Sequence, residues 1–155
     1  AYGFIPGERI DPEAMRRTFE AVEANWDVRQ TWGWDFPMMA MTAARVGEPE
    51  KAVDWLFADL KNNQWGPTGM TPRVHLDEHA DELVPVSAGA GGVEMAINPD
   101  GPGYRRAAET YFPSNGSLLM AVGLMAAGWD GSIGHAPGFP KDGWNVRVEG
   151  LTPAP

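Results

Sequence analysis

The stretch DFPMMAMTAARVG, residues 35–47, decides the fold class of this chain of 155 residues. Between Asp35 and Arg45, apolar residues occupy nearly every position of a predicted helix, and Gly47 supplies a stop signal. A helix that is apolar all round is buried all round. We therefore predict a fully buried helix over residues 36–46.

A second segment of the same kind, LLMAVGLMAAG, occupies residues 118–128. We predict a helix over residues 116–127 that begins near Asn115 and ends before Gly128. This helix also lacks a polar face, so we expect it to be buried on all sides.

Two further predicted helices are amphipathic. One covers residues 12–26, where Asp11 can cap the helix and Pro12 fits its first turn. The other covers residues 49–61 and follows the buried helix after a very short turn, which predicts an antiparallel helical hairpin. Each carries one apolar stripe opposite a charged face. The stripes are Met15, Phe19, Val22 and Trp26 in the first helix, and Val53, Leu56, Phe57 and Leu60 in the second.

Alternation of buried and amphipathic helices favours an α/α toroid, whose inner helices are packed on both sides. A four-helix bundle would instead give four one-sided stripes. We predict an all-α fold in which residues 1–155 form helical hairpins of a partial barrel, the carboxyl-terminal part of an α/α-toroid domain.

The remaining segments predict smaller elements. Residues 144–149 alternate between apolar and polar, which predicts a short carboxyl-terminal β-strand. The connection 62–114 is too long for a structureless loop in a compact domain. We expect a short helix within it, over about residues 74–83.

Composition and charge exclude several functional classes. The net charge of −9 leaves no basic surface for nucleic acid. No apolar run approaches the about 20 residues of a membrane span. The absence of cysteine excludes disulfides and thiolate metal sites. A content of 7 Trp, 19 Gly and 14 Pro fits a carbohydrate-active protein, and fits equally a large aromatic core with long connections.

A candidate sugar site lies where two aromatic stretches precede the two predicted buried helices. Trp32 and Trp34 stand before Asp35, and Phe112 stands before Asn115. If both helices run the same way, both stretches open onto one face, where indole rings can stack on sugar rings. A carboxylate at a helix amino end can reach sugar hydroxyls. Asp35 is therefore the candidate catalytic residue, and the other four residues are candidate substrate contacts.

Simpler structural roles compete with this interpretation. Asp35 and Asn115 each have the position and residue type of a helix N-cap. For Trp32 and Trp34, a place in the core is the simpler interpretation.

The same residues carry a resemblance to a known family. The run WGWDFPMMAMTAARVGEPEKAV, residues 32–53, resembles the penultimate hairpin of the six-hairpin glycosidases, nearest the α-L-fucosidase-like and disaccharide-phosphorylase-like branches. FPSNGSLL, residues 112–119, is similar to the start of their last inner helix. Residues 138–151 resemble the tail of bacterial members. The resemblance covers about residues 10–61 and 111–151, and it implies a glycoside hydrolase acting on oligo- or polysaccharides.

The chain departs from that family in ways that bear on catalysis. Such barrels have six hairpins and this chain supplies about two, so the general acid of an earlier hairpin is missing. Pro113 and Ser114 occupy the place of an Asp that fucosidase-like members carry. Asp35, Glu94 and Glu109 are the carboxylates left near the expected face, whereas a glycosidase needs two acting groups. We therefore expect as partners a carbohydrate substrate and either the remainder of the barrel or a second copy of the chain.

Two other classes stay open. The run HLDEH, residues 75–79, fits the H-x-x-E-H pattern of a zinc-dependent hydrolase, with His75 and His79 as ligands and Glu78 as base, although no third ligand is placed. The chain could also be a non-catalytic sugar-binding or assembly module. Under the glycosidase hypothesis we expect no cofactor and no metal. We also expect an extracellular or periplasmic location, since Ala1 rather than Met begins the sequence.

Overall fold

The computed structural model describes residues 2–5, 7, 9–66, 69–71, 73–76, 104–108 and 110–155. The chain divides into two compact units. Unit 1 comprises Ala1–Trp26, Asp35–Ala58 and Ser117–Pro155, and unit 2 comprises Asp27–Trp34 and Asp59–Gly116. The described part of the chain is mostly helical, so the all-α prediction is confirmed at this level.

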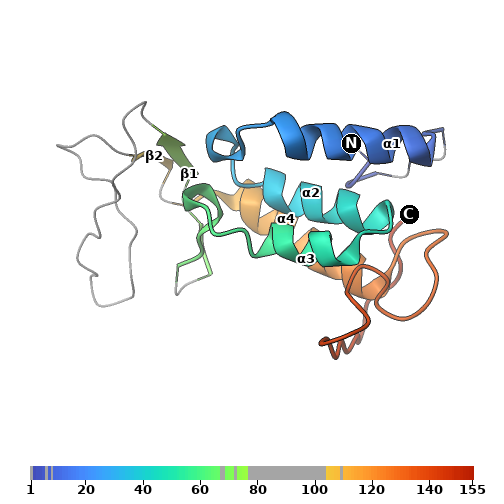
Figure 1. The fold of residues 1–155 in the computed structure, drawn as a ribbon. Helices are drawn as coiled ribbons and strands as arrows, with labels where there is room; N and C mark the ends of the chain where they lie inside the picture. The colour runs from blue at the N-terminus through green and yellow to red at the C-terminus, as the bar shows by residue number, and fades with distance from the viewer. Residues whose placement is uncertain are drawn as a thin grey trace. The chain divides into compact units, whose positions relative to one another are not determined.

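The first three helices of unit 1 are α1 (Pro12–Asn25), α2 (Asp35–Arg45) and α3 (Pro49–Leu56). Figure 1 shows them lying side by side, with α2 between the other two. The predicted cap of α1 is confirmed, since the backbone N–H of Glu13 donates to Asp11 Oδ1 at 3.0 Å. Gly47 takes a φ of +86° after α2, which lets the chain reverse at once into α3.

Helix α2 forms the centre of the unit 1 core, as its sequence predicts. Its buried residues are Phe36, Pro37, Met39, Ala40, Met41, Thr42, Ala43 and Ala44. Phe19 of α1 and Ala52 of α3 join the same hydrophobic cluster, and four residues of the predicted stripes are partly buried against it, namely Met15, Val22, Val53 and Leu56. Trp26 and Phe57, which were also assigned to the stripes, follow the last residues of their helices and are 49 % and 72 % exposed.

Helix α4 (Phe112–Ala127) begins four residues earlier than predicted. The helix starts before Asn115 and Gly116 because Pro113 fits the first turn of a helix, where its missing N–H leaves no hydrogen bond unmade. In unit 1, the buried residues of α4 join the core around α2; they are Ala121, Leu124, Met125 and Ala126.

The prediction that α4 is buried on all sides is wrong for this chain. Leu119 is 75 % exposed, and Met120 and Val122 are each more than 40 % exposed. A helix that is apolar on every side is expected to be buried on every side. The residues that bury it can belong to another polypeptide as well as to the same chain.

Other expected bounds also need correction. Helix α3 ends at Leu56 and not at residue 61, because the backbone of Leu60 is extended as it enters the next element. Residues 144–149 are not a β-strand. Val146 and Val148 are half-buried and Arg147 is exposed, so the alternation reflects one-sided packing without a partner strand.

The described residues of unit 2 form two 3₁₀ turns and one small sheet. The turns are η1 (Val28–Gln30) and η2 (Lys61–Asn63). Strand β1 (Arg73–Leu76) pairs antiparallel with β2 (Tyr104–Ala108). The predicted helix over residues 74–83 is therefore wrong at residues 74–76, which form part of β1, and its remainder lies outside the described residues.

Candidate functional site

Four of the five candidate site residues belong to unit 2, namely Trp32, Trp34, Phe112 and Asn115. Asp35 belongs to unit 1, where it is the first residue of α2 and is half-buried in front of the buried Phe36. Its catalytic role stays a prediction.

Within unit 2, the two aromatic stretches lie next to each other. The ring of Trp32 approaches the ring of Tyr111 with a centroid distance of 6.1 Å and an interplanar angle of 50°. Trp32 is 51 % exposed and Phe112 is 66 % exposed, whereas Trp34 is half-buried. Trp32 and Phe112 therefore present ring surface that a ligand can reach.

Asn115 lies in the first turn of α4 and is not its N-cap, since the helix begins at Phe112. Its Nδ2 donates to the backbone oxygen of Gly69 at 2.7 Å, which ties the helix start to the 69–71 segment. Tyr111 N–H donates to Thr71 O at 2.9 Å and gives the same two segments a second link.

Three buried side-chain oxygens at this junction lack a hydrogen-bond partner within the described part of unit 2. They are Thr71 Oγ1, Ser114 Oγ and Asn115 Oδ1. Buried polar atoms are almost always satisfied in folded proteins, so these three oxygens are exceptions among the described residues.

Gly33 separates the two indoles and needs to be glycine. Its φ is +86°, and a Cβ built on it would lie 2.6 Å from Asn62 O and 2.9 Å from Ser114 Oγ. Both contacts are too short for any other residue. The backbone between Trp32 and Trp34 is therefore packed directly against two other parts of unit 2.

Asn62 is the residue at this site that sequence reasoning missed. It is 3 % exposed, and its Nδ2 donates to Val28 O at 2.8 Å, to Thr31 O at 3.0 Å and to Thr31 Oγ1 at 3.1 Å. An Asn-Asn pair in a connecting segment gives no local signal of this role, because its partners are more than 30 residues away. Taken together, unit 2 combines exposed rings with buried polar atoms on a fixed backbone, an arrangement able to bind a polar ring compound.

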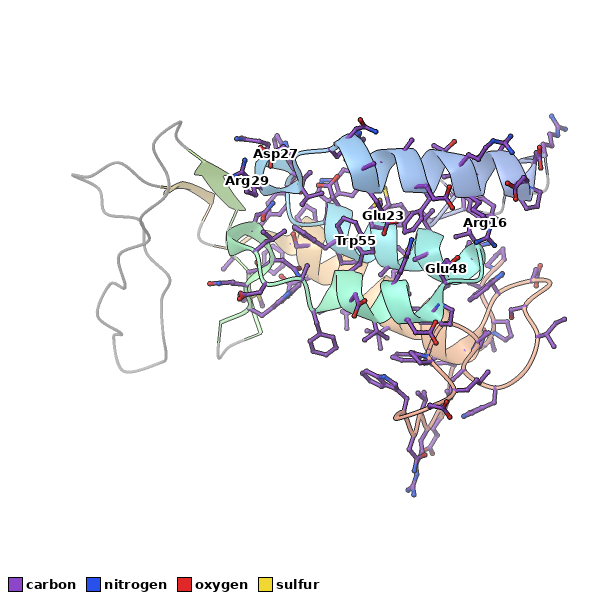
Figure 2. The ribbon with its side chains drawn as sticks, in the orientation of Figure 1. Arg16, Glu23, Asp27, Arg29, Glu48 and Trp55 are labelled. Carbon is purple, nitrogen blue, oxygen red and sulfur yellow. The ribbon has the colours of Figure 1, made fainter. Side chains whose placement is uncertain are left out.

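The strongest polar cluster of unit 1 is structural. Glu23 of α1 accepts hydrogen bonds from Lys51 Nζ at 2.8 Å and from the indole N–H of Trp55 at 3.1 Å, both on α3. Figure 2 shows Glu23 and Trp55 in the space between the two helices. The hydrogen bond from Lys51 to Glu23 raises the pKa of Lys51. These bonds satisfy the carboxylate and link α1 to α3 through their side chains.

A second ion pair fixes the other end of α1. Arg16 Nη1 donates to Glu48 Oε1 at 2.6 Å, and Arg16 Nη2 donates to Val46 O at 2.6 Å. The guanidinium thus satisfies backbone and side-chain oxygens at the turn between α2 and α3.

Arg45, at the end of α2, is held between two aromatic rings. Its guanidinium carbon lies 5.9 Å from the ring centroid of Tyr2 and 5.7 Å from that of Trp129, and Nη2 donates to Pro155 O at 3.0 Å. Burial lowers the pKa of Arg45. The side chain joins the first residues of the chain to the segment after α4 and has the environment of a structural residue.

The exposed side of α4 is a candidate interface. Leu119, Met120 and Val122, here called the α4 face, are apolar and exposed, and no charged residue occurs between Phe112 and Ala127. A Cβ built on Gly123 would meet no atom within 4 Å, so this position is open to a neighbour.

The structure describes none of the side chains that the proposed zinc site would use. Glu78 and His79 lie outside the described residues, as do Glu94 and Glu109, and only the backbone of His75 is described, within β1. Where the chain is described, no group of three or more His, Asp or Glu residues is placed to bind a metal. No helix in that part is long and apolar enough to cross a membrane.

Comparisons of the chain with protein-family models, with curated proteins and with solved structures found no match.

Proposed function

We propose that the chain is the carboxyl-terminal portion of an α/α-toroid glycoside hydrolase that acts on oligo- or polysaccharides, with its sugar-binding surface in unit 2. The observation that supports sugar binding best is the half-exposed ring of Trp32, placed against Tyr111 within unit 2. A sugar has apolar C–H faces that stack on aromatic rings and hydroxyls that both donate and accept hydrogen bonds.

The charge of the chain favours a neutral sugar as the ligand. A net charge of −9 opposes the approach of carboxylated or sulfated saccharides. Trp32, Trp34, Phe112 and Asn115 are the proposed substrate contacts.

Asp35 is the proposed acid–base or substrate-contacting carboxylate. Hydrolysis of a glycosidic bond needs a second carboxyl group, or a water activated opposite an acid. We propose that this second group comes from the remainder of the barrel.

The exposed α4 face supports the proposal that the remainder of the barrel packs against this chain. An uncharged helix with Leu119 75 % exposed leaves apolar area that other helices of a toroid would cover. Its three side chains form only part of the about 800 Å² that each partner gives to a stable interface of standard size. The proposed occupant is therefore a layer of helices from the rest of the domain, and a second copy of this chain is the competing outcome.

The experiment compares hydrolysis of neutral oligosaccharides by the assembled protein, purified with the polypeptide that covers α4, and by its Asp35→Asn variant. Asp35 is the first residue of α2 and not its N-cap, and Asn keeps the size and shape of the Asp side chain at this position. Folding should therefore survive while turnover falls at least about tenfold. The matched control is Asp11→Asn, which changes the cap of α1 and should leave turnover unchanged.

Full turnover in the Asp35→Asn variant would reduce Asp35 to a structural residue. Sugar binding without turnover in the wild-type protein would favour a non-catalytic binding module. Zinc in the purified protein, with activity lost on chelation, would favour the hydrolase using His75, Glu78 and His79.

A further inference from the structure

The segment that carries Trp32 and Trp34 contains little regular structure of its own. It consists of the single turn η1 followed by Thr31 and the left-handed Gly33. Short irregular segments hold one conformation only when surrounding contacts impose it. The position of both indoles in unit 2 therefore depends on what holds residues 28–33.

Asn62 contributes three hydrogen bonds that hold this segment. Its amide donates to oxygens at both ends of the turn, at Val28 and at Thr31, over distances of 2.8 to 3.1 Å. Every one of these partners is a carbonyl or hydroxyl oxygen close to Nδ2, so the amide is oriented as a donor.

The backbone of Asn62 fixes the next residue. Its carbonyl oxygen would lie 2.6 Å from a Cβ on Gly33, so carbonyl and glycine are in direct contact. Thr31 Oγ1 also donates to Val28 O at 2.8 Å, which closes the turn internally. One buried side chain thus holds the segment up to Thr31, and the main chain of the same residue meets it at Gly33.

We infer that Asn62 is a positioning residue for the sugar-binding surface, which holds the Trp32-Gly33-Trp34 segment in its binding conformation without touching the ligand. The inference rests on the proposed function for its consequence in sugar binding. Its structural part, that Asn62 sets the environment of the two indoles, stands independently of any ligand.

The main variant is Asn62→Asp. A carboxylate of the same shape cannot donate, and it would face Val28 O and Thr31 O with like partial charge. Protonation at low pH restores one O–H donor, so the effect should reverse in part as the pH falls. A neutral core substitution would not give such a pH profile.

A milder pair of variants covers the case in which Asn62→Asp fails to fold. Thr31→Val removes one acceptor and the internal hydroxyl bond, whereas Thr31→Ser keeps the hydroxyl. The two variants differ in the side-chain hydroxyl at position 31, which the inference requires. Thr31→Ser is therefore the matched control.

The experiment records ¹⁹F NMR spectra of the protein labelled with 5-fluorotryptophan, with the signals of Trp32 and Trp34 assigned by Trp→Phe substitution. We expect Asn62→Asp and Thr31→Val to shift or broaden these two signals at pH 7 and to leave Trp55 and Trp129 of unit 1 unchanged. Lowering the pH should return the Asn62→Asp signals toward the wild-type positions. If the variant leaves the segment competent a tenth of the time, affinity for a neutral oligosaccharide falls about tenfold.

Unchanged Trp32 and Trp34 signals in both variants would overturn the inference. Equal changes at all tryptophans would also overturn it, because Asn62 would then be a general stabilising residue. Shifted Trp32 and Trp34 signals in a protein that binds no oligosaccharide would uphold the positioning role and refute the proposed function, so the two failures are distinguishable.

Discussion

Leu119 and Leu124 lie five residues apart on helix α4, yet Leu119 is 75 % exposed and Leu124 is 3 % exposed. The same apolar helix therefore has one side in the core of unit 1 and one side open. A sequence that is apolar on both sides is expected where both sides are covered in the functional assembly.

The two sides of α4 should respond differently to substitution. Leu124→Ala should destabilise the chain by about 2–5 kcal/mol, because it leaves a cavity in the core. Leu119→Glu should change the free energy of unfolding by less than about 0.5 kcal/mol while it abolishes assembly. Urea denaturation and light scattering measure the two effects, and a large loss of stability in Leu119→Glu would show that the chain already covers this side.

Gly123→Leu offers a cleaner test of the same interface. The added side chain begins in open space, and leucine favours a helix over glycine by roughly 0.8 kcal/mol. We expect the isolated chain to keep or gain stability and the assembly to be blocked. Assembly that proceeds normally with Gly123→Leu would place the partner elsewhere.

Gly33→Ala should be much more costly than glycine substitution at another left-handed position. Gly143→Ala carries only the conformational cost of about 1–2 kcal/mol, since its φ is +79° and a Cβ there meets no atom within 4 Å. At Gly33 the overlap with Asn62 O should add roughly 1–3 kcal/mol. Chemical denaturation of the two variants measures the difference, and equal costs would contradict the close packing at Gly33.

The Glu23–Lys51 pair predicts a stability contribution that is lost at high pH. Because folding raises the pKa of Lys51, the contribution is fully present below the unfolded pKa of about 10.4 and disappears as the pH rises through the folded pKa. Lys51 and Glu23 remain partly exposed, so Glu23→Gln should cost only about 0.2–1 kcal/mol at pH 7. The side-chain amide oxygen of this variant can still accept the hydrogen bond from the indole of Trp55.

Glu13→Gln is the control for that pH dependence. Glu13 pairs with Arg16 and Arg17, which keep their charge at alkaline pH. The destabilisation caused by Glu23→Gln should therefore shrink at alkaline pH while that of Glu13→Gln stays constant. A constant effect of Glu23→Gln up to about pH 12 would mean that Lys51 does not respond to Glu23.

Local sequence signals predicted the elements that depend on neighbouring residues. The apolar run 35–47 with Gly47 predicted α2 and its burial, and Asp11 with Pro12 predicted the start of α1. Helix α3 was predicted too long, because Leu60 continues the apolar stripe while its backbone is already extended.

Features that depend on distant residues were not predictable from local patterns. Arg73 pairs with Ala108 in the sheet, and Asn62 bonds to Val28 and Thr31, in each case across a long separation. The exposure of one side of α4 was not predicted for a related reason. An apolar pattern predicts that a helix is buried, but it does not identify the polypeptide that buries it. The aromatic residues of the candidate site could be identified from the sequence because they precede predicted helices. The polar residues that hold them in place, such as Asn62, had no comparable local signal.

The most direct test of sugar binding is calorimetric titration of neutral oligosaccharides into the protein, comparing wild type with Trp32→Ala and Trp26→Ala. Trp26 is 49 % exposed and Trp32 is 51 % exposed, so the two tryptophans are matched in exposure and differ in location. We predict saturable binding that Trp32→Ala weakens roughly tenfold, the effect of losing about 1.4 kcal/mol of ring stacking, and that Trp26→Ala leaves unchanged. Absence of binding across the panel, or equal affinity of wild type and Trp32→Ala, would contradict a carbohydrate site in unit 2.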